Sequence, residues 1–342
     1  MAPPGEPIPL SLYVYEPNKG APIFFAVAYG VSAVFHIWQC FRYKAWKLMW
    51  LHSLCAVLFT AGYALREWGA FNYIYSPFDN TPLIVFVLSQ VFIYVCPPLL
   101  ELSNYHVLGR VFYYVPYCSP MPPSRVLATF GGLMAVVEAL NAVGVALGTN
   151  PSGNSQSLGK NLILAAISIQ VGVIIIFVAL AVLFHIRFTR ARIGSRAVTT
   201  ILLVLYASMA LIFVRCIYRL VEHTGETKID LDNMEALRRL SPLLRYEVYF
   251  YVFEASLMLI NSCLWNAWHP GRFLPRDYHI YLAQDGTEVE GEKVEDSRPL
   301  LAKTAHVLTF GILFRNKKNV LQHRSHEQEL SECPPRSSHS AI

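Results

Sequence analysis

Charged residues are scarce in this sequence. Only 15% of the 342 residues are Asp, Glu, Lys or Arg, whereas soluble domains contain about 25%. Hydrophobic residues make up 54%, and the mean hydropathy is +0.38. A soluble fold of this length needs more charge to cover its surface. The excess of apolar side chains therefore indicates a protein that faces lipid.

Paired cysteine motifs are also lacking. The seven cysteines show no paired spacing and no CxxC motif, which argues against a disulfide framework or a zinc site. No HxxxH spacing occurs either, so we expect no metal and no cofactor. The net charge of +5 lies in short basic clusters beside apolar runs. Such clusters do not form the basic stripe of a nucleic-acid partner.

Several functional motifs are absent. No GxxxxGK[ST] loop occurs, so transport driven directly by a nucleotide is excluded for this chain. Residues 246–268 contain no lysine for a retinal Schiff base. The third apolar stretch is followed by LGRVFYY rather than an acidic-Arg-aromatic triplet, and the last lacks NPxxY, which weakens a receptor interpretation. No aspartate lies inside an apolar stretch, which disfavours an intramembrane hydrolase. We therefore expect that the protein is not an enzyme.

Seven apolar stretches are long enough to cross the roughly 30 Å hydrocarbon layer of a bilayer as helices. Helices are expected because backbone polar groups in lipid must be satisfied within their own segment. The predicted fold is therefore all-α, a bundle of seven transmembrane helices. The predicted cores are 22–41, 48–68, 82–102, 126–148, 161–186, 197–221 and 246–268.

Lysine and arginine are distributed unevenly between the two sets of loops. The short loops after the first, third and fifth stretches hold nine of them, and the alternate loops with the amino-terminal segment hold seven. Four of those seven share the sixth loop with five acidic residues. The positive-inside rule then predicts a cytosolic carboxyl terminus and an amino terminus outside. We therefore expect an integral membrane protein, and the plasma membrane is the simplest location for it.

The predicted organisation has three parts. Residues 1–21 are a polar, extracellular amino-terminal segment without the features of a cleavable signal peptide. Residues 22–268 form the membrane domain, and residues 269–342 form a cytosolic, largely disordered tail. Within that tail, the apolar patch 306–314 precedes three basic residues and is either a chance cluster or a segment that lies on the inner leaflet.

Polar residues inside the apolar stretches are candidate functional residues, because burying them in lipid is costly. Pro97 and Pro98 are expected to break the third helix and to form a hinge. Arg215 and its neighbours are expected to pair with acids of the fourth and seventh helices, and such pairs can also serve only to hold the bundle together. The remaining candidates are Glu138, Asn141, Gln170, Arg219, Glu222, Glu247, Tyr251 and Glu254.

The order of these motifs resembles the fungal lipid-translocating exporter family, named for aminosterol resistance and for export of sphingoid long-chain bases. The resemblance covers about residues 13–275 and is densest from Leu211 to Glu222. Further matching pieces are Tyr15 to Asn18, Gly62-Tyr63 with Arg66, Pro98, Asn104 to Arg110, Gln170, Glu247, Tyr251 to Glu254, and His269 to Gly271. The chain departs from the family pattern at Phe59, Met134 and Asn141, and has Glu254 where Asp is usual.

The resemblance implies that the protein moves or releases amphipathic lipids, such as a sphingoid base or a sterol-like compound, or confers resistance to toxic ones. A carboxylate is the natural partner of a sphingoid amine inside the bilayer. We therefore expect Glu138 and Glu254 to bind such a headgroup. Arg215 and Arg219 would keep these acids ionised or bind a phosphate. Two alternatives remain open: a seven-helix receptor or lipid sensor that signals through a cytosolic partner of its tail, and a structural membrane organiser.

Overall fold

The computed structural model describes residues 5–148, 153–191, 194–225, 234–277, 279–283 and 286–290. Seven helical segments in this part are long and apolar enough to cross a membrane. This confirms the predicted all-α bundle. The segments are α1 (Ala21–Tyr43), α2 (Trp46–Phe71), α3 (Thr81–Tyr114), α4 (Pro123–Gly148), α5 (Gly153–Arg190), α6 (Arg196–Thr224) and a seventh that joins α9 (Glu247–Phe250), η2 (Tyr251–Ser256) and α10 (Leu257–Ala267).

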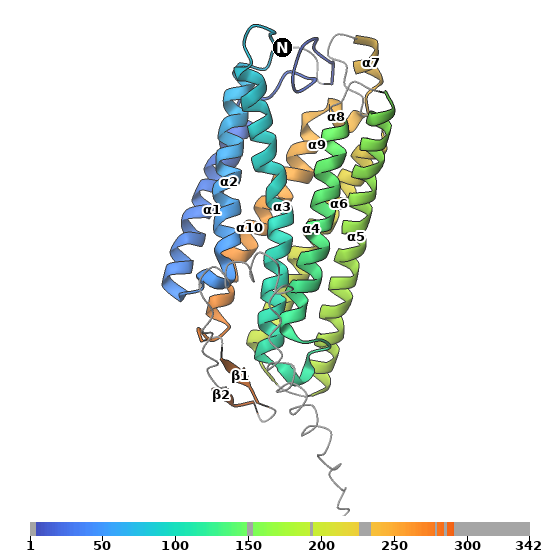
Figure 1. The fold of residues 1–342 in the computed structure, drawn as a ribbon. Helices are drawn as coiled ribbons and strands as arrows, with labels where there is room; N and C mark the ends of the chain where they lie inside the picture. The colour runs from blue at the N-terminus through green and yellow to red at the C-terminus, as the bar shows by residue number, and fades with distance from the viewer. Residues whose placement is uncertain are drawn as a thin grey trace, which may run out of the picture. The chain divides into compact units, whose positions relative to one another are not determined.

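The membrane helices form a closed bundle (Figure 1). Each helix from α1 to α6 packs on the next, and α10 contacts both α6 and α1. Helix α3 also contacts α6. Large apolar side chains cover the outer surface, for example Val34 and Phe35 on α1 and Ile176 on α5. Exposed apolar side chains along whole helices are suited to contact with lipid chains.

Glycines allow two of the helix pairs to approach closely. A Cβ atom on Gly62 would come within 2.8 Å of Ile93 on α3, and one on Gly144 would come within 2.7 Å of Ile163 on α5. Small residues at such contacts let helix backbones pack tightly in a membrane. We expect Gly62→Leu to separate α2 from α3 and to lower the melting temperature of the purified protein. Gly172→Leu should leave the melting temperature nearly unchanged, because a Cβ atom on Gly172 would meet no atom of another part of the chain within 4 Å.

Helix α3 passes through both of its internal prolines as one continuous helix. The predicted break in the third span is therefore wrong. A proline removes the backbone hydrogen bond to the residue four positions earlier, so the carbonyls of Ile93 and Tyr94 lose their helical donors. Hinge motion at Pro97 and Pro98 remains a hypothesis.

The amino-terminal segment covers one end of the bundle, which we call the amino-terminal end. Ser11 pairs with Ile74 in the α2–α3 connection, and Arg245 donates two hydrogen bonds to the Gly5 carbonyl. Val14 packs with Leu237 and Leu240. Two short helices at this end, α7 (Met234–Arg239) and α8 (Pro242–Arg245), lead into the seventh span.

The opposite end holds η1 (Pro116–Cys118), η3 (Pro270–Arg272) and the hairpin of β1 (Ile280–Leu282) and β2 (Glu288–Glu290). The strands are antiparallel, with Tyr281 opposite Val289. Leu282 is buried, and the Tyr114 hydroxyl donates to Glu288 at 2.8 Å. The first part of the tail that was predicted to be disordered is thus ordered, because β1 packs against α3 and buries Leu282. Residues 291–342, including the patch 306–314, lie outside the described residues.

Candidate functional site

A buried arginine–glutamate pair lies between α6 and η2. The Nε atom of Arg215 is 2.6 Å from Oε1 of Glu254. Arg215 is 5% exposed and Glu254 is 0% exposed. The pair joins the sixth span to the seventh, as the sequence predicts. Because Glu254 lies seven residues after the start of α9, it is about 10 Å deeper than Glu247 along the helix axis.

The second carboxylate oxygen of Glu254 has a different environment. Among the described residues, neither Oε2 of Glu254 nor the hydroxyl of Tyr63 has a hydrogen-bond partner. Glu254 lies in the π-helical turn η2, where the hydroxyl of Tyr29 donates to the Ala255 carbonyl at 2.9 Å. Most buried polar atoms are hydrogen-bonded, so an unpartnered carboxylate oxygen is a candidate ligand-binding atom.

A second buried acid, Glu101 on α3, lies near the same arginine. Gln170 on α5 donates to its Oε2 at 2.8 Å, and the hydroxyl of Tyr105 donates to its Oε1. Glu101 is 0% exposed and lies close enough to Arg215 for the positive charge of the arginine to attract its carboxylate. Gln170 is one of the predicted site residues. Glu101 is a candidate only on the general ground that it is ionisable and lies in the third apolar stretch, and no role was predicted for Glu101 or Tyr105. A carboxylate three residues after a proline pair in an apolar stretch was the available sequence signal.

The acid on α4 does not form the predicted ion pair. Glu138 is half-buried and hydrogen-bonded to Asn141, three residues later on the same helix. The charge of Arg215 acts on Glu138. Within the described residues, however, no ion pair joins Glu138 to an arginine. We call the polar residues around Arg215 the central polar cluster: Glu101, Glu138, Asn141, Gln170, Arg215 and Glu254.

Arg219 pairs within its own helix. Its Nη1 atom is 2.5 Å from Glu222, three residues further along α6, and its guanidinium lies 4.4 Å from the centre of the Tyr94 ring. The prediction that both arginines of the sixth span pair with the fourth and seventh spans is therefore wrong for Arg219. An i,i+3 pair needs no partner helix. Arg219 and Glu222 continue the polar path from the central polar cluster towards the amino-terminal end.

Arg66 on α2 forms a separate cluster at the amino-terminal end. Its Nη2 atom donates to Tyr15 at 2.9 Å and to Glu247 at 3.2 Å, and its Nε donates to Tyr251 at 3.4 Å. The guanidinium also lies 4.1 Å from the ring centre of Phe250. We call this group the Arg66 clamp.

The clamp ties the amino-terminal segment to the seventh span. Oε2 of Glu247 accepts the backbone N–H of Asn18 at 2.8 Å. Glu247 and Tyr251 were predicted site residues, whereas Arg66 was counted as a loop charge near the end of a span. The structure corrects this, because Arg66 is only 2% exposed. Only the fold brings its partners from residues 15 and 247–251 to α2.

Burial raises the pKa of the Tyr15 phenol well above its usual value, and this effect outweighs the opposing charge of Arg66. The folded protein therefore favours the neutral phenol. This stabilisation is complete below the unfolded pKa of about 10 and is lost as the pH rises towards the folded pKa. We expect the melting temperature to fall more steeply between pH 9 and 11 (about one unit either side of that pKa) in the wild type than in Tyr15→Phe. If the melting temperature fell equally steeply with pH in the wild type and in Tyr15→Phe, the buried Tyr15 phenol would not contribute to this pH dependence.

Aromatic rings occupy the space between the clamp and the central polar cluster. Phe25 stacks on Tyr251 at 5.4 Å between ring centres, and Tyr29 stacks on Phe59 at 4.5 Å and on Tyr63 at 5.5 Å. Phe59 stands where the resembled family favours an acid. No group of three metal-ligating side chains occurs among the described residues. The site is thus a set of buried charges lined by aromatic rings.

These features define an integral membrane protein of seven helices with ionisable groups buried in its centre. A family model described as "RTA1 like protein" matches residues 52–277. The chain belongs to this family. No solved structure matches it.

Several relatives of this chain carry names that describe lipid exporters or transporters. A protein of Leptosphaeria maculans named "Lipid-translocating exporter-like protein RTA1" is 57% identical over 97% of this chain, and the chain spans 65% of that relative's length. A protein of the same name from Ajellomyces capsulatus is 32% identical over 68% of this chain and 75% of its own. "Probable lipid transporter atnI" of Emericella nidulans is 25% identical over 77% of this chain and 68% of its own. The names describe exporters or transporters rather than enzymes.

Proposed function

We propose that this protein is not an enzyme but moves amphipathic lipids across the plasma membrane, with Glu254 as the partner of a cationic headgroup such as the amine of a sphingoid base. The observation that carries the proposal is the buried Arg215–Glu254 pair, whose Oε2 atom has no partner among the described residues. The names of the relatives support lipids as the substrate class.

Stability alone does not explain such a pair. Desolvating two charges costs about as much as their attraction returns, and well-packed apolar residues are often equally stable in the same place. An amine can form a charge-assisted hydrogen bond with the free oxygen while Arg215 holds the other. The π-helical turn at Glu254 supports the assignment, because π-bulges are frequent at functional sites.

Other members of the central polar cluster are proposed to follow the headgroup along its path. Glu138 on α4 is less buried than Glu254 and is also influenced by Arg215, which suits a second amine contact. Arg219 lies towards the amino-terminal end and suits a phosphate if the lipid carries one. Pro97 and Pro98 are proposed to let α3 bend as the path opens, because two of its backbone hydrogen bonds are missing.

Orientation is part of the proposal. The amino-terminal end, with the Arg66 clamp, faces outside, and the opposite end faces the cytosol. The basic residues of the α1–α2 corner and of the α5–α6 connection support this orientation through the positive-inside rule.

Leaflet exchange tests the proposal directly. The purified protein is reconstituted into phosphatidylcholine vesicles that carry a labelled sphingoid base in one leaflet. We expect the labelled base to reach the other leaflet faster than in protein-free vesicles, and slower exchange of a labelled sterol analogue would favour the amine as the recognised group. Exchange at the protein-free rate for every amphipathic lipid tried would reject lipid translocation.

A sensor is the second candidate function. The Arg66 clamp favours it, because a buried charge that joins the amino-terminal segment to the seventh span can act as a conformational lock. Removing residues 291–342 separates the two functions while leaving the hairpin on α3 in place. Translocation should persist without these residues, whereas a signal passed to a cytosolic partner should be lost.

A further inference from the structure

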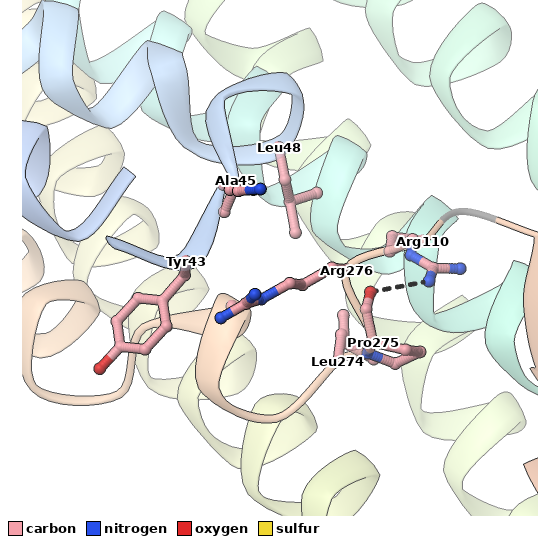
Figure 2. A pocket seen from close by; sticks show the side chains of 9 residues that line it. Tyr43, Ala45, Leu48, Arg110, Leu274, Pro275 and Arg276 are labelled. Carbon is pink, nitrogen blue, oxygen red and sulfur yellow. Dashed lines mark hydrogen bonds between the residues drawn. The ribbon is translucent and has the colours of Figure 1, made fainter. Parts of the chain in front are cut away.

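A pocket at the opposite end of the bundle is lined by Tyr43, Leu48 and Leu274 (Figure 2). Beside it, Arg110 donates to the Pro275 carbonyl at 3.2 Å, the bond drawn in Figure 2. The pocket measures about 20 Å³, which is room for roughly one water molecule. It does not admit a lipid headgroup, in contrast to a site built from the buried charges at the centre of the bundle.

The central polar cluster holds more acids than cations. Carboxyl groups from three elements lie close enough to Arg215 for its positive charge to attract them: Glu101 on α3, Glu138 on α4 and Glu254 in η2. The next cation along α6, Arg219, forms an ion pair with Glu222 instead. The carboxyl groups of the cluster therefore share a single guanidinium.

Glu254 takes the charge of Arg215, because these two residues form the buried ion pair. In the described part of the chain, no ion pair joins Glu101 or Glu138 to a cation. Glu138 is half-buried, whereas Glu101 is fully buried. An ionised carboxylate without a matching cation is costly in an interior of low dielectric constant, and a bound proton removes that cost. Glu101 is therefore the acid of the cluster best suited to hold a proton.

The hydrogen-bond partners of Glu101 fit both states of its carboxyl group. Gln170 donates to Oε2 at 2.8 Å, and the hydroxyl of Tyr105 contacts Oε1. A phenolic hydroxyl donates to a carboxylate and accepts from a carboxylic acid. Reversal of this one bond lets Glu101 bind or release a proton without moving its side chain.

The titratable and charged groups that face Glu101 come from its own helix, from α4 and from α6: Tyr105, Glu138, Arg215 and Cys216. The neighbouring side chain of α5, Gln170, is uncharged. On α2, the imidazole of His52 contacts Ser103 instead, and the thiol of Cys55 contacts the α3 backbone. Of these groups in the described chain, Arg215 is the cation that can stabilise an ionised Glu101.

We propose that Glu101 holds a proton while the lipid site is empty and releases it when a cationic headgroup binds Glu254, so that the protein exchanges a proton for an amine. This rests on the proposed function, because it takes the amine at Glu254 as given. The bound amine adds a positive charge, and the cluster can then hold a further ionised carboxylate. The O–H bond of Glu101 breaks, the proton passes to water, and Arg215 stabilises the carboxylate. A site that holds either a proton or an amine couples their movement in opposite directions.

Calorimetry counts the released proton. The detergent-solubilised full chain is titrated with a short-chain sphingoid base at about pH 6, where exposed carboxyl groups are ionised and an alkyl amine keeps its proton. The heat of binding is measured in two buffers of different ionisation enthalpy, which gives the number of protons released. We expect the wild type to release about one proton more per bound amine than Glu101→Gln, because the amide resembles the protonated acid and cannot ionise.

The affinity for the amine should also change with pH in a defined direction. The amine favours the ionised form of Glu101, so the dissociation constant of the wild type should fall as the pH rises, by up to about tenfold per pH unit. In Glu101→Gln the dissociation constant should stay nearly constant over the same range. Glu101→Asp keeps a titratable group and should keep the dependence. Glu6→Gln removes an exposed acid and should behave like the wild type.

The outcomes separate proton exchange from the amine site itself. Amine binding by the wild type without proton release, or with the same release as Glu101→Gln, would overturn proton exchange and leave the amine site at Glu254 in place. Loss of the release in Glu138→Gln but not in Glu101→Gln would move the proton to α4 and overturn the role of Glu101. A wild type that binds no amine would reject the proposed function, and proton exchange with it. If Glu101→Gln did not fold, a proton count near zero in the wild type would still reject the exchange.

Discussion

Glu254→Gln is expected to abolish protein-dependent lipid exchange, with a rate at least about tenfold lower than that of the wild type. The amide keeps the shape of the side chain but cannot compensate the charge of Arg215 or attract an amine. Removing one member of a buried pair also costs about 3 to 5 kcal/mol of stability. The melting temperature must therefore be measured beside the leaflet-exchange rate.

A double variant separates binding from stability. Arg215→Met/Glu254→Leu replaces the pair by apolar side chains and should recover the melting temperature of the wild type, because the desolvation cost disappears with both charges. Exchange should remain lost. Glu6→Gln, which removes an exposed acid, serves as the control and should exchange lipid normally. Wild-type exchange by the double variant would show that the pair only holds the helices together.

Arg66→Met is expected to give the largest loss of stability at the amino-terminal end. It leaves the carboxylate of Glu247 without its cation and removes the donor to Tyr15. The expected cost is about 3 to 5 kcal/mol, measured by chemical unfolding in detergent. The amino-terminal segment should also become more sensitive to protease, because Glu247 no longer holds it in place.

Two further substitutions show which property of Arg66 matters. Arg66→Lys keeps the charge but cannot contact the Tyr15, Tyr251 and Glu247 acceptors and the neighbouring rings together, so an intermediate loss is expected. Lys19→Gln removes an exposed cation that contacts Phe71 and should cost less than about 1 kcal/mol. If Arg66→Met were as stable as Lys19→Gln, the clamp would have no structural role.

Composition and hydropathy were sufficient to predict the seven spans and the class of the fold. Each predicted core lies within or closely matches the bounds of its helix, because the bilayer demands about 20 apolar residues for every crossing. The failures of prediction have local causes. The paired prolines of α3 were expected to break it, but neighbouring helices hold the helix on both sides of them. Residues 269–342 were expected to form a largely disordered tail, but Leu274 and Leu282 in its first part are buried.

The sequence by itself determined which polar residues had to be buried, since Arg215, Glu254 and Gln170 lie inside apolar stretches long enough to span the bilayer. Only the tertiary structure decided their partners. Arg215 pairs with Glu254 rather than with Glu138, and Arg219 pairs with Glu222 on its own helix. Arg66 bonds to residues up to 185 positions away in the sequence. Helical periodicity places residues on a face of one helix, whereas the rotation and depth of the neighbouring helix set which charges meet. That arrangement depends on packing across the whole bundle, which no single segment encodes.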